Sequence, residues 1–145
     1  MSRVYLLTAA HPLPLCDRQA ERESVVTVEG KAFAISFVRG FRVAEHIYYR
    51  HAVDRLGYFM LPWQYELEAE ICETDLAHLK AYLTANSCSG ETAELWSVWI
   101  GNDRSNELSH LCCRLEDLGL EILEQFLKPG LQGGLPRQCR LTITI

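Results

Sequence analysis

No apolar run in this sequence approaches the roughly 20 residues that a membrane-spanning helix requires. The N-terminal run from Val4 to Ala10 has a single basic flanking residue, Arg3, and is followed by Pro12 and Pro14, so it lacks the pattern of a secretory signal. We therefore expect no membrane association and a cytoplasmic location. The six cysteines contain no C-x-x-C pair, and in a reducing compartment we expect them to be free thiols.

The short motifs of common catalytic and cofactor sites are also missing. There is no G-x-S-x-G, H-E-x-x-H, Walker or G-x-G-x-x-G pattern. The segment 103–107 alternates carboxylates with a hydroxyl, but Leu108 and Arg114 stand where a calcium loop needs glycine and glutamate. We predict no catalytic residue, no metal and no cofactor, and we favour a protein without enzymatic activity while leaving that question open.

Basic residues are in the minority, with 14 Lys and Arg against 19 Asp and Glu and a net charge of −5. This balance disfavours nucleic acid and anionic lipid as partners, because both attract an excess of positive charge. With 145 residues, of which 48% are hydrophobic, the chain can bury a substantial core and is not expected to be disordered. We predict a single domain over residues 1–145.

The pattern of apolar residues predicts strands at residues 2–9, 24–29, 32–38, 64–72, 93–100 and 138–145. Several of them alternate apolar and polar residues, whereas the strand at 93–100 is apolar on both faces and is expected in the middle of the sheet. Gly30-Lys31 lies between the second and third of these and predicts a hairpin, preceded by a charged loop or short helix at 17–23. In the hairpin's second strand Phe33, Ile35 and Phe37 alternate with Ala34 and Ser36, which places small residues on the outer face.

Helical spacing of apolar residues predicts three amphipathic helices, at 41–56, from Thr74 to about Asn86, and at 107–128. The first remains ambiguous, because its β-branched and aromatic residues also suit a strand. We predict the α+β class: a two-layer α/β sandwich with one mixed sheet of about six strands and three amphipathic helices on one face.

Half of the 14 aromatic residues fall between residues 41 and 65, together with three arginines and two histidines. Tyrosine, tryptophan and arginine dominate protein-binding surfaces because they combine a large contact area with polar ends. We predict a surface binding patch at the residues that a helix at 41–56 would leave outside, together with a nearby tryptophan: Arg42, His46, Tyr49, Arg50 and Trp63.

Glu66, Glu68 and Glu70 form an acidic row on one face of the strand at 64–72. We expect this row to be a solvated strand face with basic cross-strand neighbours such as Arg140. In a second interpretation the row contacts a basic partner.

These observations favour a small soluble cytoplasmic binding or regulatory protein that acts through protein–protein contacts. Two alternatives stay open: a small enzyme or ligand-binding protein with a pocket lined by aromatic residues and histidine, and an acidic immunity-type inhibitor of a basic toxin domain. The expected partner is another protein or a second copy of the chain. In the second case Ala34 and Ser36 on the outer face of the hairpin would permit close approach of two sheets.

Overall fold

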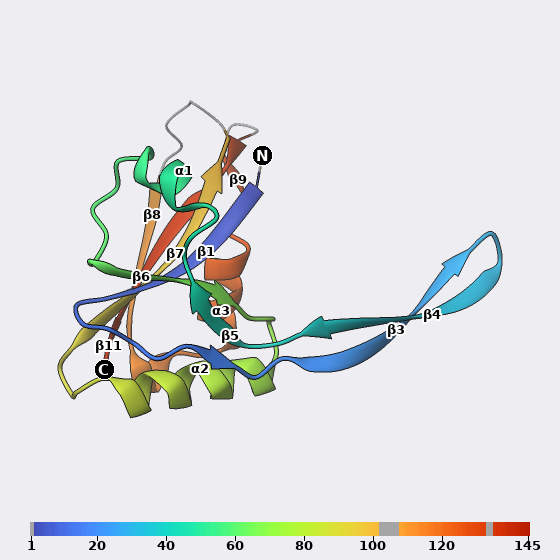
Figure 1. The fold of residues 1–145 in the computed structure, drawn as a ribbon, viewed down its shortest axis with the longest axis horizontal. Helices are drawn as coiled ribbons and strands as arrows, with labels where there is room; N and C mark the ends of the chain where they lie inside the picture. The colour runs from blue at the N-terminus through green and yellow to red at the C-terminus, as the bar shows by residue number, and fades with distance from the viewer. Residues whose placement is uncertain (1, 102–107, 133–134) are drawn as a thin grey trace.

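The computed structural model describes residues 2–101, 108–132 and 135–145. Its central element is a seven-stranded sheet with the order β2-β5-β6-β1-β7-β11-β8 (Figure 1). All neighbouring strands are antiparallel except β8 and β11, which are parallel. The predicted mixed α/β fold is thus confirmed, with seven strands in the main sheet rather than about six. The strands are β1 (Ser2–Ala9), β2 (Cys16–Asp17), β5 (Arg42–Glu45), β6 (Trp63–Glu68), β7 (Thr92–Ile100), β8 (Leu108–Arg114) and β11 (Gln138–Thr144).

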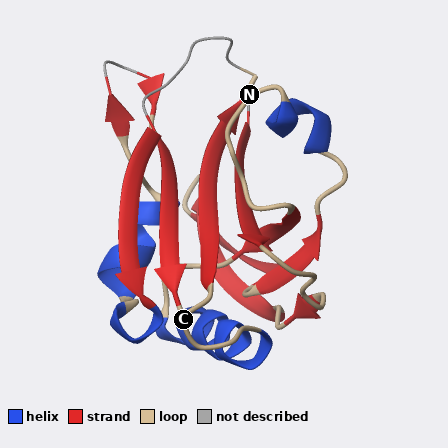
Figure 2. Cartoon of the chain, turned by 90° about the vertical axis from the view of Figure 1, so that its left-hand side faces the viewer, coloured by secondary structure: helices blue, strands red, loops and turns tan. Residues whose placement is uncertain are grey.

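Strand β7 lies near the centre of the sheet, as its apolar residues on both faces predict. Leu95 faces a first core, where α2 (Glu73–Asn86) and α3 (Leu120–Leu127) cover the sheet. Trp96 faces a second core, where Val53 of α1 (Arg50–Asp54) packs on the other side. Helices therefore lie on both sides of the sheet (Figure 2), and the expectation of three helices on one face is not met.

Two of the three predicted helices take a different form. The helix expected at 41–56 is strand β5 followed by the short α1, because Phe41 and Val43 alternate into the first core. The helix expected at 107–128 is strand β8, the 3-10 turn Leu115–Asp117 and helix α3. The third, α2, is confirmed, and Leu76, Leu79 and Leu83 form its buried stripe.

A long β-hairpin projects from the body of the molecule (Figure 1). It consists of β3 (Ala20–Val28) and β4 (Lys31–Arg39), and we call residues 20–39 the arm. The turn at Glu29-Gly30 has φ values of 52° and 76°, as a tight two-residue hairpin turn requires. The hairpin prediction is confirmed, but β3 includes most of the segment expected to be a loop or short helix.

Two short strands, β9 (Leu131–Gln132) and β10 (Leu135–Pro136), form a separate ribbon. The segment 103–107, compared above with a calcium loop, lies outside the described residues. In the part of the chain that the structure describes, no helix is both long enough and apolar enough to cross a membrane.

Gly40 joins the arm to the body in a conformation that disfavours a side chain. Its φ is +138°, and a Cβ there would lie 3.1 Å from the carbonyl oxygen of Arg18. We expect Gly40→Ala to lower the free energy of unfolding by about 3 kcal/mol, because it adds a steric clash to backbone strain. Gly57→Ala, where φ is +74° and no atom lies within 4 Å of the added Cβ, should cost about 1 kcal/mol. Urea denaturation of both variants measures the difference; equal losses would contradict the assigned clash.

Candidate functional site

The arm carries its large apolar side chains mainly on one face. In the antiparallel register Val26 lies opposite Phe33, and Ser24 lies opposite Ile35. Residues that lie directly opposite each other share a face, so this face collects most of the arm's large apolar residues. We call it the apolar face of the arm: Val26, Val28, Phe33, Ile35 and Phe37. The opposite face alternates isolated valines with small and acidic residues.

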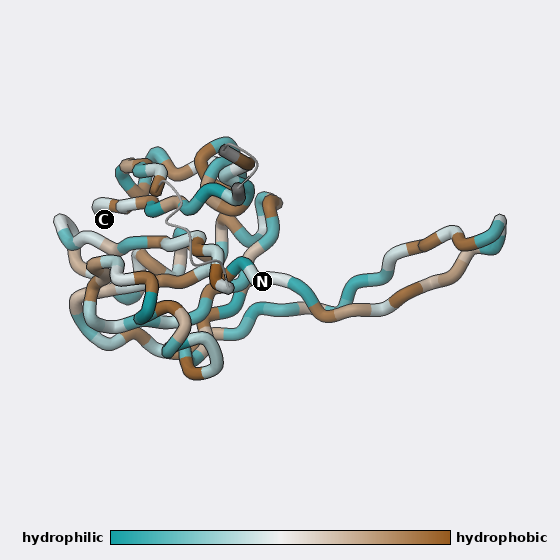
Figure 3. The backbone as a smooth tube through the Cα atoms, turned by 90° about the horizontal axis from the view of Figure 1, so that it is seen from above, coloured by the Kyte–Doolittle hydropathy of each residue, from teal (hydrophilic) through white to brown (hydrophobic). Residues whose placement is uncertain are grey.

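Four of these apolar residues are exposed to solvent, and Phe37, which lies beneath the guanidinium of Arg39, is half-buried. The exposed fractions of Phe33 and Ile35 are 51% and 45%, whereas we expected this face to be turned inward. The reason is that the arm is a two-stranded sheet separate from the main one, so neither of its faces is covered by the body. Figure 3 shows the apolar segments extending toward the tip of the arm, away from the core. A contiguous exposed apolar surface of this kind marks an interaction site.

The acidic row holds the base of the arm. The guanidinium of Arg22 on β3 pairs with the Glu70 carboxylate, and Arg39 on β4 donates to the same carboxylate at 3.2 Å. Glu68 accepts hydrogen bonds from Gln19 and, at 3.4 Å, from Arg42. The row therefore has basic neighbours, as predicted, but they come from the arm and from β5.

Arg140, the neighbour that we named from the sequence, lies elsewhere on the sheet. Its guanidinium is 2.7 Å from Nδ1 of His110, and its Nε is 3.9 Å from the carboxylate of Glu94. Arg140 therefore does not contribute to the base of the arm.

Asp75 extends the ion-pair cluster at the base of the arm into the interior. It is buried, accepts a hydrogen bond from the backbone N–H of Glu70 at 2.7 Å, and lies 3.7 Å from Arg22. Within the described ranges the one group of side chains with metal-ligand geometry is Glu70, Cys72 and Asp75, whose ligand atoms lie within 4.8 Å of one another. Because arginine already supplies the positive charge there, this group is a structural ion-pair cluster.

We predict that Glu70→Ala loosens the arm without unfolding the body. The exposed ion pairs of Glu70 are worth no more than about 1 kcal/mol each, so the midpoint of denaturation should change little. The two arginines lose their shared carboxylate, so 15N relaxation should report faster independent motion of residues 20–39 relative to the sheet. Glu73→Ala, which removes an exposed carboxylate from the start of α2, is the control. Identical arm relaxation in wild type and Glu70→Ala would contradict this role.

The predicted binding patch is only partly a surface. Arg50 is exposed, Trp63 is 46% exposed, and Arg42 and Tyr49 are half-buried. His46 is buried beneath them, because the chain runs from β5 across the edge of the sheet there instead of forming a helix. The structure brings three of the five residues, His46, Arg50 and Trp63, to the rim and floor of one hollow of about 530 Å³.

We call this concavity the β5–β6 hollow, because it lies where β5 ends and β6 begins. Its wall is largely apolar, with Ile47, Pro62 and Trp63, and its two charged residues are Glu45 and Arg50. Sequence reasoning identified Arg50 and Trp63 but missed Ile47 and Glu45. Ile47 and Glu45 line the hollow because the chain turns between β5 and α1. The sequence analysis predicted one continuous helix over 41–56 and therefore no such turn.

Below this hollow, His46 and Glu66 face each other. Nδ1 of His46 lies 3.8 Å from Oε1 of Glu66, beyond hydrogen-bond distance, and neither atom has another partner among the described residues. Burial, and secondarily the charge of Arg50, lower the pKa of His46. Burial, and secondarily the charge of Glu68, raise the pKa of Glu66. Each group is thus held toward its uncharged form.

The lowered pKa of His46 makes the protein sensitive to acid. Above its unfolded pKa of 6.5 the ring is neutral in both states and contributes nothing. As the pH falls below 6.5, the unfolded chain binds a proton that the folded chain binds less readily, so stability decreases. We expect His46→Gln to lose less unfolding free energy than wild type between pH 7 and pH 5, measured by urea denaturation. His51→Gln, which removes an exposed histidine of α1, should follow wild type; equal slopes in all three proteins would contradict the assignment.

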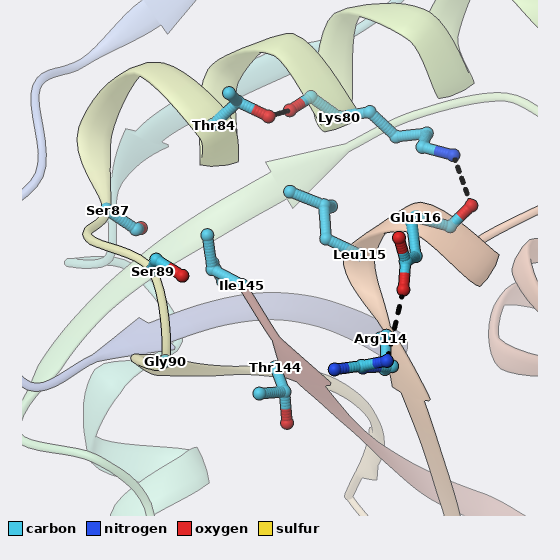
Figure 4. Close-up of a pocket in the computed structure, with 10 residues that line it drawn as sticks. All are labelled: Lys80, Thr84, Ser87, Ser89, Gly90, Arg114, Leu115, Glu116, Thr144 and Ile145. Atoms are coloured by element: carbon cyan, nitrogen blue, oxygen red, sulfur yellow. Dashed lines mark hydrogen bonds and ion pairs between the residues drawn. The ribbon is translucent and has the colours of Figure 1, made fainter.

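Another concavity, of about 610 Å³, lies between the end of α2 and the ends of β8 and β11 (Figure 4). Its two cations are already engaged. Lys80 donates to the carbonyl oxygen of Leu118 at 2.9 Å, and Arg114 pairs with Glu116 at 3.3 Å. We find no free charged group of the described residues there that would recognise a ligand.

A possible nucleophile at Cys88 is not activated. Cys88 hydrogen-bonds Glu91, and this contact raises the pKa of the thiol. His11 lies 2.7 Å from the other side of Glu91 and does not contact the sulfur. Because a nucleophilic cysteine needs a lowered pKa, this arrangement does not support covalent catalysis.

Comparison with known proteins adds no functional assignment, since no family model, curated protein or solved structure matches the chain. The arm is therefore the feature of the described structure that most directly indicates an activity.

Proposed function

We propose that this chain is a small binding or regulatory protein and that it recognises its protein partner through the apolar face of the arm. The observation that carries this proposal is the exposure of Phe33 and Ile35 on a hairpin that projects from the body. The arm contacts the body at its base, through Arg22 and Arg39, whereas Phe33 and Ile35 stay exposed and do not belong to either core of the fold.

The energetics of the arm favour contact with another molecule. Burying a large apolar side chain is worth about 1.5–3 kcal/mol, and the arm offers several that are roughly half exposed. A partner that covered this face would gain several kcal/mol from burial alone. The hairpin is also marginal by itself, because two strands without a covering layer are rarely stable in water.

The fixed base of the arm strengthens the proposal. Ion pairs from both strands of the arm to Glu70 hold it in one orientation before any partner arrives. Holding a binding element in place reduces the entropy that association would otherwise cost. The contacts that support binding thus include the acidic row, although the row does not itself meet the partner.

The alternatives receive less support. In an acidic inhibitor of a basic domain, Glu68 and Glu70 would need to be free, yet arginines of the same chain occupy them. An enzyme would need an activated group, and neither the His46–Glu66 pair, whose facing atoms are not hydrogen-bonded, nor the unactivated Cys88 provides one.

A matched pair of double variants tests the proposal. Phe33→Asp/Ile35→Asp places two charges on the apolar face, and Ala32→Asp/Ala34→Asp places two charges on the opposite face of the same strand. Tagged proteins are used to capture partners from extracts of the source cells, with identification by mass spectrometry. We expect the first variant to recover its partners at least about tenfold less well than wild type.

The second variant should bind like wild type. Circular dichroism checks that both variants keep the fold. The same recovery from wild type and from Phe33→Asp/Ile35→Asp would overturn the proposed function.

A further inference from the structure

We propose that the partner of the arm is a second copy of this chain, with each arm lying in the β5–β6 hollow of the other copy. The inference rests on the proposed function and names the partner of the same surface. Four properties of the hollow and the arm support it: both surfaces are apolar, their charges are complementary, the arm is long enough to reach another copy, and the contact approaches the size of a specific interface.

The hollow exposes apolar side chains on the body that match the arm. Ile47 at its rim is 70% exposed and Trp63 is 46% exposed. They present an aliphatic and an aromatic surface of the same kind as Ile35 and Phe33 on the arm. Contact between the two surfaces removes both from water.

Charges on the two surfaces are complementary. The arm carries Glu29 and Lys31 at its tip, and the hollow carries Glu45 and Arg50. Glu45, Glu29 and Lys31 have no ion-pair partner among the described residues, and Arg50 meets Asp54 only at 4.0 Å. An arm seated in the hollow can place Lys31 beside Glu45 and Glu29 beside Arg50. In this arrangement the two glutamates stay apart, and so do the two basic residues.

An arm can reach the hollow of another copy but not its own. A nine-residue strand spans about 30 Å, and the hollow lies a few residues beyond Gly40 along β5, roughly 15–20 Å from the base. The arm leaves the base in the direction away from the body, as Figures 1 and 3 both show. Its ion pairs to Glu70 oppose folding back, so a second copy must supply the arm that fills the hollow.

The size of the contact approaches that of a specific interface. Each copy contributes the five residues of the apolar face, Glu29 and Lys31 at the tip, and the eight residues that line the hollow, against about 20–30 residues per partner in specific interfaces. In a two-fold arrangement each copy contributes one arm and one hollow, so the contact occurs twice. This interface uses the face opposite to Ala34 and Ser36, the residues that the sequence suggested for dimer contact.

The first experiment measures mass in solution by light scattering coupled to size exclusion, over a concentration series. We expect wild type to be a dimer. Phe33→Asp/Ile35→Asp on the arm should weaken the dimer at least about 100-fold. Ile47→Glu in the hollow should weaken it about tenfold. Ala32→Asp/Ala34→Asp should remain dimeric, and circular dichroism confirms the fold of each protein.

The second experiment mixes the arm variant with the hollow variant. Neither protein alone has an intact contact, but the mixture pairs an intact arm of one with an intact hollow of the other. We expect a mixed dimer with one working contact, detected by light scattering and by co-purification of a single tag. Formation of the mixed dimer supports the proposal.

Three outcomes overturn the inference. A dimeric wild type whose variants give no mixed dimer places the contact elsewhere, for example between two arms. Loss of the dimer in Ala32→Asp/Ala34→Asp assigns it to the other face. A wild type that is monomeric at all concentrations excludes the second copy as partner. The proposed function is tested separately, by the capture experiment.

Discussion

A two-stranded hairpin has no interior, so the apolar side chains that it carries can leave water only against another element. In the main sheet this requirement is met within the chain: Leu95 and Trp96, neighbours on β7, point into separate cores that helices close from opposite sides. In the arm the same requirement is not met within the chain, and Phe33 and Ile35 stay exposed. This difference between body and arm, rather than any cleft or reactive group, is the basis on which we propose the arm as the functional surface.

The charges at the base of the arm connect that surface to the fold. Glu68 and Glu70 continue the acidic row of β6 up to the point where α2 begins, and arginines from both strands of the arm and from β5 meet them there. The acidic row, which the sequence predicts to be a solvated strand face, thus helps to fix the direction of the arm. Exposed ion pairs contribute little to global stability, but here they restrict the orientation of the element that we propose as the binding surface.

The sequence predicts each strand whose pattern is strict and each turn that is chemically marked. Alternation predicted β6 and β11, apolar runs predicted β1 and β7, and Gly30 predicted the hairpin. It failed where two periods fit the same residues: Leu108, Leu111, Leu115 and Leu118 have helical spacing, yet they divide between strand β8 and a 3-10 turn. The predicted binding patch depended on the same error at 41–56, so Arg50 is exposed as expected whereas His46 is buried. The outward direction of Phe33 could not be predicted, because alternation shows that two faces differ but not which one is covered.

In the proposed dimer, the exposed apolar surface and the unpaired strand edges of the arm must be covered within a closed pair of two copies. An arm that docks on a neighbour can continue from copy to copy as an open chain, and long apolar hairpins with free edges favour such aggregates. Closure requires that the arm of the second copy return to the first, which fixes the angle between arm and body. Glu70 and Gly40 set this angle, the first by pairing with two arginines and the second by a backbone conformation that other residues disfavour. In this proposed dimer the base of the arm favours a closed pair over an open chain, because the ion pairs to Glu70 and the backbone conformation of Gly40 fix the direction of the arm.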